Sequence, residues 1–124
     1  MKLGIVVQRY GADVSGGAEL HARYIAEHLS RHADVRVFTT CARDYVTWRN
    51  EYAAGPDTVN GVHVERFPVA RERDPHEFGT HSARVFQSRH SIADELRWVE
   101  HEGPCSPALV RRIERARTEV DYLL

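Results

Sequence analysis

The sequence predicts an α/β domain in which helices cover both faces of a mostly parallel sheet. Two observations support this prediction. The first forty residues hold a short apolar run, a glycine-bearing loop, an amphipathic helix and a second β-rich run, which together form a βαβ pattern with a right-handed crossover. The chain of 124 residues, 42% hydrophobic and 28% charged, has the size and composition of one globular domain with one core.

The parts of the βαβ unit can be placed in order. Residues 3–7 are continuously apolar, as expected of a strand buried on both faces of a parallel sheet. After the loop comes a helix whose apolar residues recur at helical spacing, namely Ala22, Ile25, Ala26 and Leu29. Residues 35–40 are rich in β-branched side chains and predict a second strand, parallel and adjacent to the first. We therefore expect a Rossmann-like domain with three layers.

The middle of the chain is less regular. Segment 41–56 is aromatic and polar without a clean period, and no element is predicted there. Residues 58–64 predict a β-hairpin, because Asn60 and Gly61 suit the two positive-φ positions of a type I′ turn. Pro68 ends the second strand of this hairpin.

The second half is predicted to be helical. Asp74 can cap a helix, Pro75 fits its first position, and Glu77 stands where a capping box needs an acid. Ser91 is another competent cap, so we expect a break there.

The end of the chain predicts one more helix and one more strand. Gly103-Pro104 ends the preceding helix, and Ser106-Pro107 opens the next. Residues 121–124 resemble the first residues of a strand. We therefore expect residues 1–124 to form a single domain that is cut before its last strands.

Composition and charge exclude several classes of protein. The formal net charge of −1 argues against a nucleic-acid binder, although sixteen of the seventeen cations are arginine, which we interpret as a compositional habit. No apolar stretch approaches the ~20 residues of a membrane span, and the opening apolar run stops at Gln8, too early for a signal peptide. Cys41 and Cys105 make neither a disulfide framework nor a paired-cysteine zinc site, so a reducing cytoplasm is expected.

The most informative motif lies between the first strand and the first helix. Ligands of open α/β sheets bind outside the carboxyl ends of the strands, and Gly16-Gly17 places free amides and a helix dipole there. An anion site is one interpretation, and a glycine turn without a ligand is the other. The spacing fits neither the dinucleotide fingerprint nor a P-loop. Glu19 would repel a phosphate unless it points away.

Several segments carry a family resemblance that covers nearly the whole chain: residues 6–10, 15–21, 39–42, 48–52, 60–62, 66–69 and 103–107. The block Trp48-Arg49-Asn50-Glu51-Tyr52, followed by Asn-Gly-Val and Arg-Phe-Pro-Val, is more specific than the glycine pair. On these motifs the chain resembles the N-terminal domain of family 4 (group 1) glycosyltransferases, which are retaining enzymes of the GT-B fold.

The resemblance implies a fold and an activity. In GT-B enzymes two Rossmann-like domains face each other, and the N-terminal domain supplies most of the acceptor site. Gly16 and Gly17 match the family's glycine positions, so the resemblance implies that they bind the donor diphosphate. Transfer from a nucleotide-diphosphate sugar to a glycan or lipid-linked acceptor of the cell envelope is then expected, without a metal or other cofactor. Such an enzyme would work in the cytoplasm or on the inner face of its membrane.

The chain also departs from the family pattern. The second GT-B domain, with its nucleotide pocket, is missing, and the family's N-domain histidine would lie beyond Leu124. Glu19 and Glu27 match the family's E-x7-E spacing by chance, because they lie on the first helix. We therefore assign no catalytic residue and expect the fragment alone to be inactive and prone to self-association.

The acceptor side has three candidate residues, Tyr10, Trp48 and Arg49. Aromatic faces suit the apolar face of a pyranose, although packing onto the sheet is the alternative for both rings. Arg9, Arg43 and Arg49 have the chemistry to meet phosphate groups, but in an arginine-rich chain we interpret them mainly as solvated surface charges.

Two further interpretations concern metals and other functions. His28 and His32 stand four apart on the first helix, but no acidic residue completes a zinc motif, so no metal is predicted. A stand-alone, non-catalytic α/β binding module is the main alternative to the enzyme. A dinucleotide-dependent oxidoreductase lacks its fingerprint.

Overall fold

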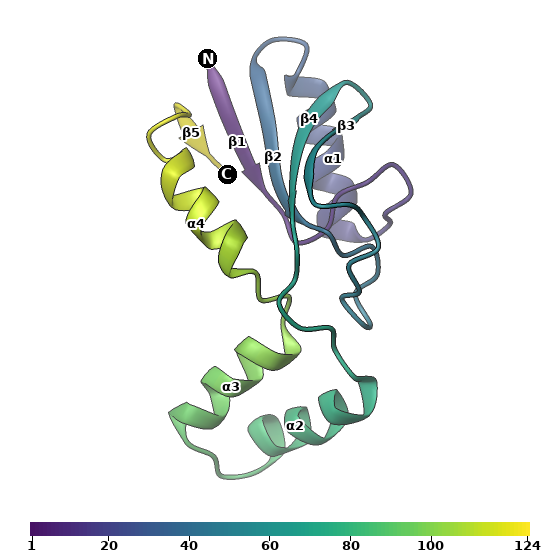
Figure 1. The fold of residues 1–124 in the computed structure, drawn as a ribbon, viewed down its shortest axis with the longest axis vertical. Helices are drawn as coiled ribbons and strands as arrows, with labels where there is room; N and C mark the ends of the chain where they lie inside the picture. The colour runs from purple at the N-terminus through teal and green to yellow at the C-terminus, as the bar shows by residue number, and fades with distance from the viewer.

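The computed structural model describes all 124 residues, which form a five-stranded sheet and four helices (Figure 1). The strands are β1 (Lys2–Val6), β2 (Asp34–Thr40), β3 (Gly55–Val59), β4 (Val62–Phe67) and β5 (Tyr122–Leu123). The helices are α1 (Gly17–Leu29), α2 (Pro75–Gln87), α3 (Ile92–Glu102) and α4 (Pro107–Ala116). The order of strands in the sheet is β3-β4-β2-β1-β5.

The predicted βαβ unit is confirmed. β1 pairs with β2 in parallel, in a register that runs from Lys2 opposite Asp34 to Val6 opposite Phe38. Each strand begins one residue earlier than the apolar pattern indicates, because pairing includes the polar residue at its start. β2 also pairs with β4 in parallel, and β5 pairs with β1 in parallel.

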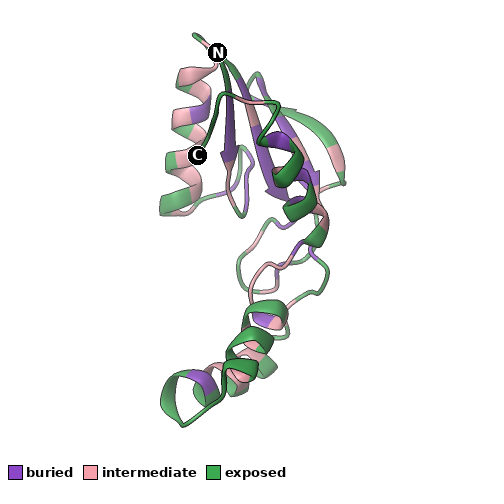
Figure 2. Ribbon diagram, turned by 90° about the vertical axis from the view of Figure 1, so that its left-hand side faces the viewer, coloured by how far each residue is buried: buried purple, intermediate pink, exposed green.

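The sheet lies between two layers of helix, as predicted. α1 packs on one face, where it shares a core cluster with strands β1 to β4 and the loop after β1. The cluster consists of Leu3, Ile5, Tyr10, Ala26, Val35, Val37, Val59, Val62 and Val64. α4 packs on the other face, where Leu109 and Ala116 contact Phe38. Figure 2 shows the buried strands between α1 and α4.

The hairpin of β3 and β4 is the one antiparallel pair. Asn60 and Gly61 have φ angles of 50° and 82°, as their predicted turn requires. β3 begins at Gly55, inside the segment for which the sequence predicts no element.

The helices α2 and α3 form a hairpin that projects beyond the carboxyl ends of the strands (Figure 1). Asp74 caps α2 as predicted, by accepting from the amides of His76 and Glu77. The capping box expected from Glu77 is absent, because that carboxylate pairs with Arg71 instead. The predicted break at Ser91 is confirmed, and α3 begins there with a capping box.

Apolar side chains remain exposed on this helical hairpin and on α4, as the sequence leads one to expect for its late helices; they are Phe86, Ile92, Leu96, Val99 and Val110. No helix has both the length and the hydrophobicity that crossing a membrane requires. The strand predicted at the end of the chain is present as β5, whose pairing with β1 joins Leu3 to Tyr122 and Gly4 to Leu123.

Candidate functional site

The candidate site lies at the carboxyl ends of β1 and β2, between the loop that leads to α1 and the segment that follows β2. These loops enclose an open cup of about 290 Å³, which we call the loop cup. Its lining is mostly polar: Arg9, Asp13, Val14, Ser15, Arg43, Asp44, Tyr45, Val46 and Glu51. Parallel strands place their carboxyl ends at one sheet edge, which is why two loops 30 residues apart in sequence meet there.

The N-terminus of α1 opens next to this cup with unused hydrogen-bond donors. The first helical bond runs from the amide of Leu20 to the carbonyl of Gly16, at 2.8 Å. No side chain caps the helix, and the amides of Gly17, Ala18 and Glu19 have no acceptor in the chain. A Cβ at Gly17 would meet nothing within 4 Å, so the space before these amides is open. Free amides at the positive end of a helix dipole suit an anion.

The Glu19 carboxylate lies beside this helix end, where Arg9 pairs with it. Arg9 Nε and Nη2 lie 3.0 and 2.8 Å from Oε1 of Glu19, and Arg9 Nη1 donates to the carbonyl of Arg43 at 3.0 Å. Both side chains are largely buried. A Cβ at Gly16 would collide with the Glu19 carboxylate, so glycine is needed at Gly16 for this close approach. The interpretation of Arg9 as a solvated surface charge is therefore wrong.

A second polar cluster fixes the tip of the loop. The Tyr52 hydroxyl donates to Asp13 Oδ1 at 2.5 Å, and Arg43 pairs with the other carboxylate oxygen. The hydrogen bond from Tyr52 lowers the pKa of Asp13, and burial together with this bond raises the pKa of Tyr52 to about 12. A Cβ at Gly11 would collide with the Tyr52 ring, so Gly11 lets the loop approach it.

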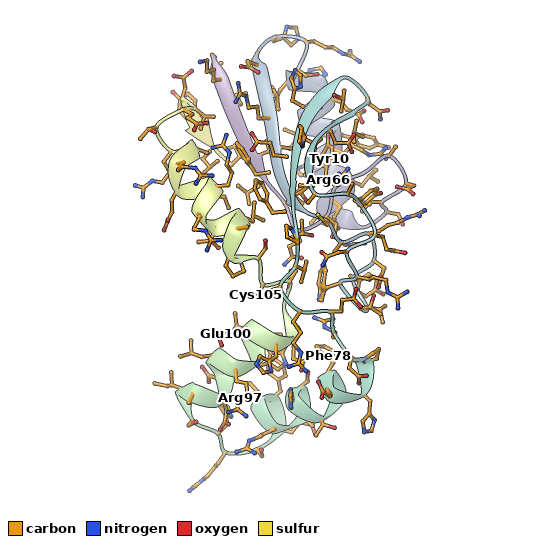
Figure 3. All side chains as sticks on the ribbon, viewed as in Figure 1. Tyr10, Arg66, Phe78, Arg97, Glu100 and Cys105 are labelled. Atoms are coloured by element: carbon orange, nitrogen blue, oxygen red, sulfur yellow. The ribbon has the colours of Figure 1, made fainter.

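Arg66 anchors the same loop from beneath, and the sequence does not predict this role. Its side chain is 2% exposed, its Nη1 donates to the carbonyl of Tyr10 at 2.6 Å, and its guanidinium lies 4.0 Å from the centroid of the Tyr52 ring. Its Nε pairs with Asp57 at 3.1 Å. Figure 3 shows Arg66 beside Tyr10 in the sheet domain. The one signal in the sequence is spacing: Arg66 stands two and four residues after Val64 and Val62 in β4, so it shares their buried face.

The three predicted acceptor residues do not form one surface. Tyr10 is fully buried in the core, and burial raises its pKa to about 12, so its ring is closed to a sugar in this arrangement. Arg49 faces solvent, where its Nε lies 3.8 Å from Glu72. Trp48 is 5% exposed and packs on Ala42 and Val69, with a φ of 54° that is rare for a bulky residue. Packing within the domain, the alternative to sugar contact, therefore accounts for the whole Tyr10 side chain and for most of the Trp48 side chain.

Trp48 nevertheless reaches a second opening at the same sheet edge. A cleft of about 530 Å³, the neck cleft, lies where the helical hairpin joins the sheet domain. It is more apolar than the loop cup and is lined by Gln8, Trp48, Arg73, Trp98, Val99, Gly103, Pro104, Cys105, Ser106 and Val110. Arg73 stacks over the Trp48 ring at 5.3 Å, and Nε1 of Trp48 donates to the carbonyl of Glu102 at 3.3 Å. The two openings give the carboxyl edge one polar and one apolar side.

No group of three or more histidine, cysteine or acidic side chains is arranged to hold a metal. His28 and His32 lie edge to face, with ring centroids 5.9 Å apart. Cys41 is buried, which raises the pKa of its thiol and keeps it protonated at neutral pH.

Comparisons with known proteins do not assign the chain to a family: no family model matches it, and neither a curated protein nor a solved structure does.

Proposed function

We propose that this chain is the acceptor-side domain of a retaining, nucleotide-sugar-dependent glycosyltransferase of the GT-B type. The single observation that supports the proposal best is the open N-terminus of α1, where three amides lack acceptors and Gly17 leaves the approach clear. The sequence motifs that resemble family 4 glycosyltransferases add the reaction class. An acceptor of the cell envelope would bring such an enzyme to the inner face of the cytoplasmic membrane.

The chemistry follows from this placement. Transfer of a glycosyl group releases a nucleoside diphosphate, whose negative charge grows as the bond to the sugar breaks. Preorganised amides and a helix dipole stabilise such developing charge without reorganisation. The Arg9–Glu19 ion pair neutralises the carboxylate that lies beside Gly16, and the space in front of Gly17 stays open for the ligand. In this proposal the neck cleft, with Trp48 at its wall, receives the acceptor.

The test is a pair of glycine variants with matched surroundings. Gly17 and Gly79 both have open space where a Cβ would stand, so the Cβ of a valine meets no neighbouring atom within 4 Å at either position. We expect uridine and guanosine diphosphate sugars to bind the chain with millimolar Kd, as a few exposed polar contacts allow. Gly17→Val should weaken this binding at least tenfold, whereas Gly79→Val should leave it unchanged. Chemical-shift titration of the backbone amides measures both.

Turnover separates the enzyme from the non-catalytic binding module. The isolated chain should release no nucleoside diphosphate from these donors, because orientation of both substrates supplies much of the rate. Micromolar donor binding, or turnover by these 124 residues alone, would contradict the proposal that this domain supplies the acceptor side and only part of the donor site. Equal binding by the Gly17→Val and wild-type chains would overturn the α1 site. Binding at α1 without turnover by a longer chain that includes a second domain would favour the module.

A further inference from the structure

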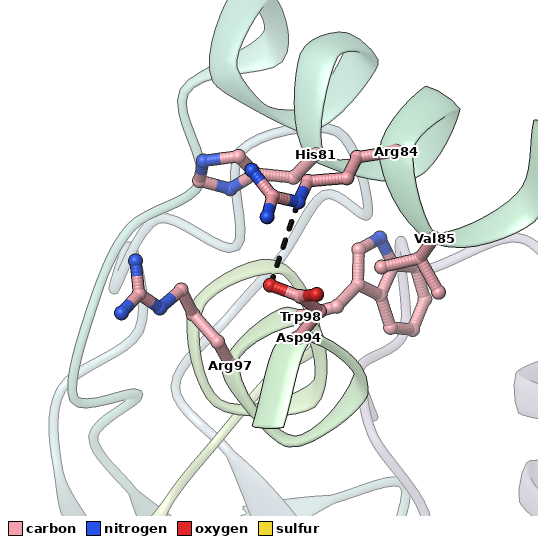
Figure 4. Close-up of a pocket in the computed structure, with 6 residues that line it drawn as sticks. All are labelled: His81, Arg84, Val85, Asp94, Arg97 and Trp98. Carbon is pink, nitrogen blue, oxygen red and sulfur yellow. Dashed lines mark ion pairs between the residues drawn. The ribbon is translucent and has the colours of Figure 1, made fainter. Parts of the chain in front are cut away.

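A small hollow lies between α2 and α3, apart from the loop cup, and its rim carries two arginines. It shares the Trp98 side chain with the neck cleft. It has a volume of about 70 Å³ and is lined by His81, Arg84, Val85, Asp94, Arg97 and Trp98 (Figure 4). One water needs about 10–15 Å³ of such volume, so the hollow accommodates about five heavy atoms. That is the number of atoms in a phosphate group.

A buried carboxylate holds His81 in place at this rim. Nδ1 of His81 lies 2.6 Å from Oε1 of Glu102, whose side chain is 1% exposed. A carboxylate accepts hydrogen bonds, so Nδ1 carries a proton and Nε2 is the ring nitrogen left for a ligand. To donate to a phosphate oxygen Nε2 must carry a second proton, so the ligand binds the imidazolium form of His81. A buried acid that orients a half-exposed imidazole is costly to maintain for packing alone, because the other oxygen of Glu102 has no partner in the chain.

The two arginines of the hollow have spare hydrogen-bond donors. Arg97 makes no ion pair and no side-chain hydrogen bond, and Arg84 makes one loose ion pair, 3.4 Å from Nε to Oδ1 of Asp94. Asp94 is the one carboxylate at the rim, and its other oxygen accepts from the amide and hydroxyl of Ser91 in the α3 capping box. Hydrogen bonds from Ser91 and the nearby Arg84 lower the pKa of Asp94. Arg84 and Arg97 balance the carboxylates of Asp94 and of Glu102 behind His81, so the protonated His81 ring gives the opening its excess of positive charge. The Trp98 ring forms one wall.

We propose that this hollow between α2 and α3 binds a phosphate monoester, with Arg84, Arg97 and Nε2 of His81 around the phosphate oxygens. Guanidinium forks match the tetrahedral geometry of phosphate, and two forks with an imidazole suit the terminal, doubly charged group better than a bridging diester. The same chemistry is presented by a small phosphorylated metabolite and by the headgroup of an anionic lipid. This site is independent of the diphosphate site proposed at α1.

The experiment compares two exposed arginines of the same hairpin. Arg97 lines the hollow, whereas Arg89 lies in the turn between the helices and lines no pocket. Inorganic phosphate and glycerol 3-phosphate, added at constant ionic strength, should shift the indole N–H resonance of Trp98, which donates to Ser82 at 2.9 Å. Arg97→Gln should weaken binding about tenfold, the equivalent of one charge-assisted hydrogen bond, and Arg89→Gln should change it less than about twofold.

Further arms identify the source of the phosphate and guard against misfolding. His81→Gln should also weaken binding, and circular dichroism checks that each variant folds. Vesicles that contain phosphatidic acid, if they bind with the same dependence on Arg97 while free phosphate esters do not, assign the site to a lipid headgroup. The proposal is overturned if neither source saturates the Trp98 shift by about 20 mM phosphate groups, or if Arg97→Gln and Arg89→Gln behave alike. Shifts confined to the amides of α1 would overturn it as well.

Discussion

Replacing Arg66 with methionine tests the mechanism that holds the candidate site together. The guanidinium is buried beneath the loop after β1, where it joins three elements: the carbonyl of Tyr10, the ring of Tyr52 and the carboxylate of Asp57. Methionine keeps most of the aliphatic volume but removes every polar contact. Because Tyr10 is fully buried, its carbonyl would lose this donor without gaining water.

The expected loss of stability follows from these contacts. An unsatisfied buried carbonyl costs about 1–3 kcal/mol, and loss of a partly desolvated cation–π contact costs about 0.5–2 kcal/mol. The ion pair adds little, at most about 1 kcal/mol, because the Asp57 side chain is 46% exposed and water screens it. Since contacts to one side chain are not independent, we expect Arg66→Met to cost about 2–4 kcal/mol in total. That is a large part of the roughly 5–15 kcal/mol that stabilises an ordinary domain.

Urea denaturation followed by circular dichroism measures this loss. Arg36→Met is the matched control on the neighbouring strand, because its guanidinium is 42% exposed and lies 3.9 Å from Asp34. The control should lose less than about 0.5 kcal/mol. A loss below about 1 kcal/mol for Arg66→Met, or one equal to that of the control, would refute the role of Arg66 as an anchor.

Three further results are expected. Tyr52→Phe should raise the pKa of Asp13 toward its ordinary value in an NMR titration, and an unchanged pKa would contradict this. In the wild type, the stability that Asp13 contributes is fully present above the ordinary pKa of an aspartate and should be lost as the pH falls through the lowered pKa of Asp13. Ser106→Ala should cost about 1 kcal/mol in thermal unfolding, since its hydroxyl caps α4 and also donates to the carbonyl of Pro68 at 2.7 Å; no loss would show that the cap is dispensable. Self-association seen in sedimentation at high concentration should weaken in Leu96→Glu, which removes an exposed apolar side chain from α3, and a strictly monomeric wild type would contradict it.

The elements of the fold were predictable because their signals are local. A buried strand reads as a continuous apolar run, a capped helix begins at a serine or aspartate, and Asn60-Gly61 encodes its own turn. The projection of α2 and α3 away from the sheet was not predictable. Their apolar residues have the helical spacing of a core face, and that spacing does not distinguish packing on a sheet from packing on a second helix.

For the candidate site, position was predictable and contacts were not. Gly16 and Gly17 stand at the start of α1, at the carboxyl edge of the strands where ligands of open α/β sheets bind. The burial of Tyr10 depends on a loop that folds back over Arg66, a residue 56 positions later in the chain. The alternation of side chains between the two faces ends where the strand ends. The sequence therefore does not indicate whether an aromatic side chain just after a strand faces a ligand or the core.

Arginine content illustrates the same limit in chemical terms. Composition alone indicates that the many arginines of this chain are surface charges, yet Arg9, Arg66 and Arg112 are only 5%, 2% and 9% exposed. Each uses the planar fork in more than one direction: Arg9 joins Glu19 to a backbone carbonyl, Arg66 joins a carbonyl to a carboxylate, and Arg112 joins Glu65 to Glu119. A lysine ammonium carries the same charge but cannot span two partners on opposite sides of a rigid plane or stack on Tyr52. These buried arginines therefore stabilise the fold through contacts that net charge does not reveal. Arg66→Lys should retain only part of the stability that Arg66→Met loses.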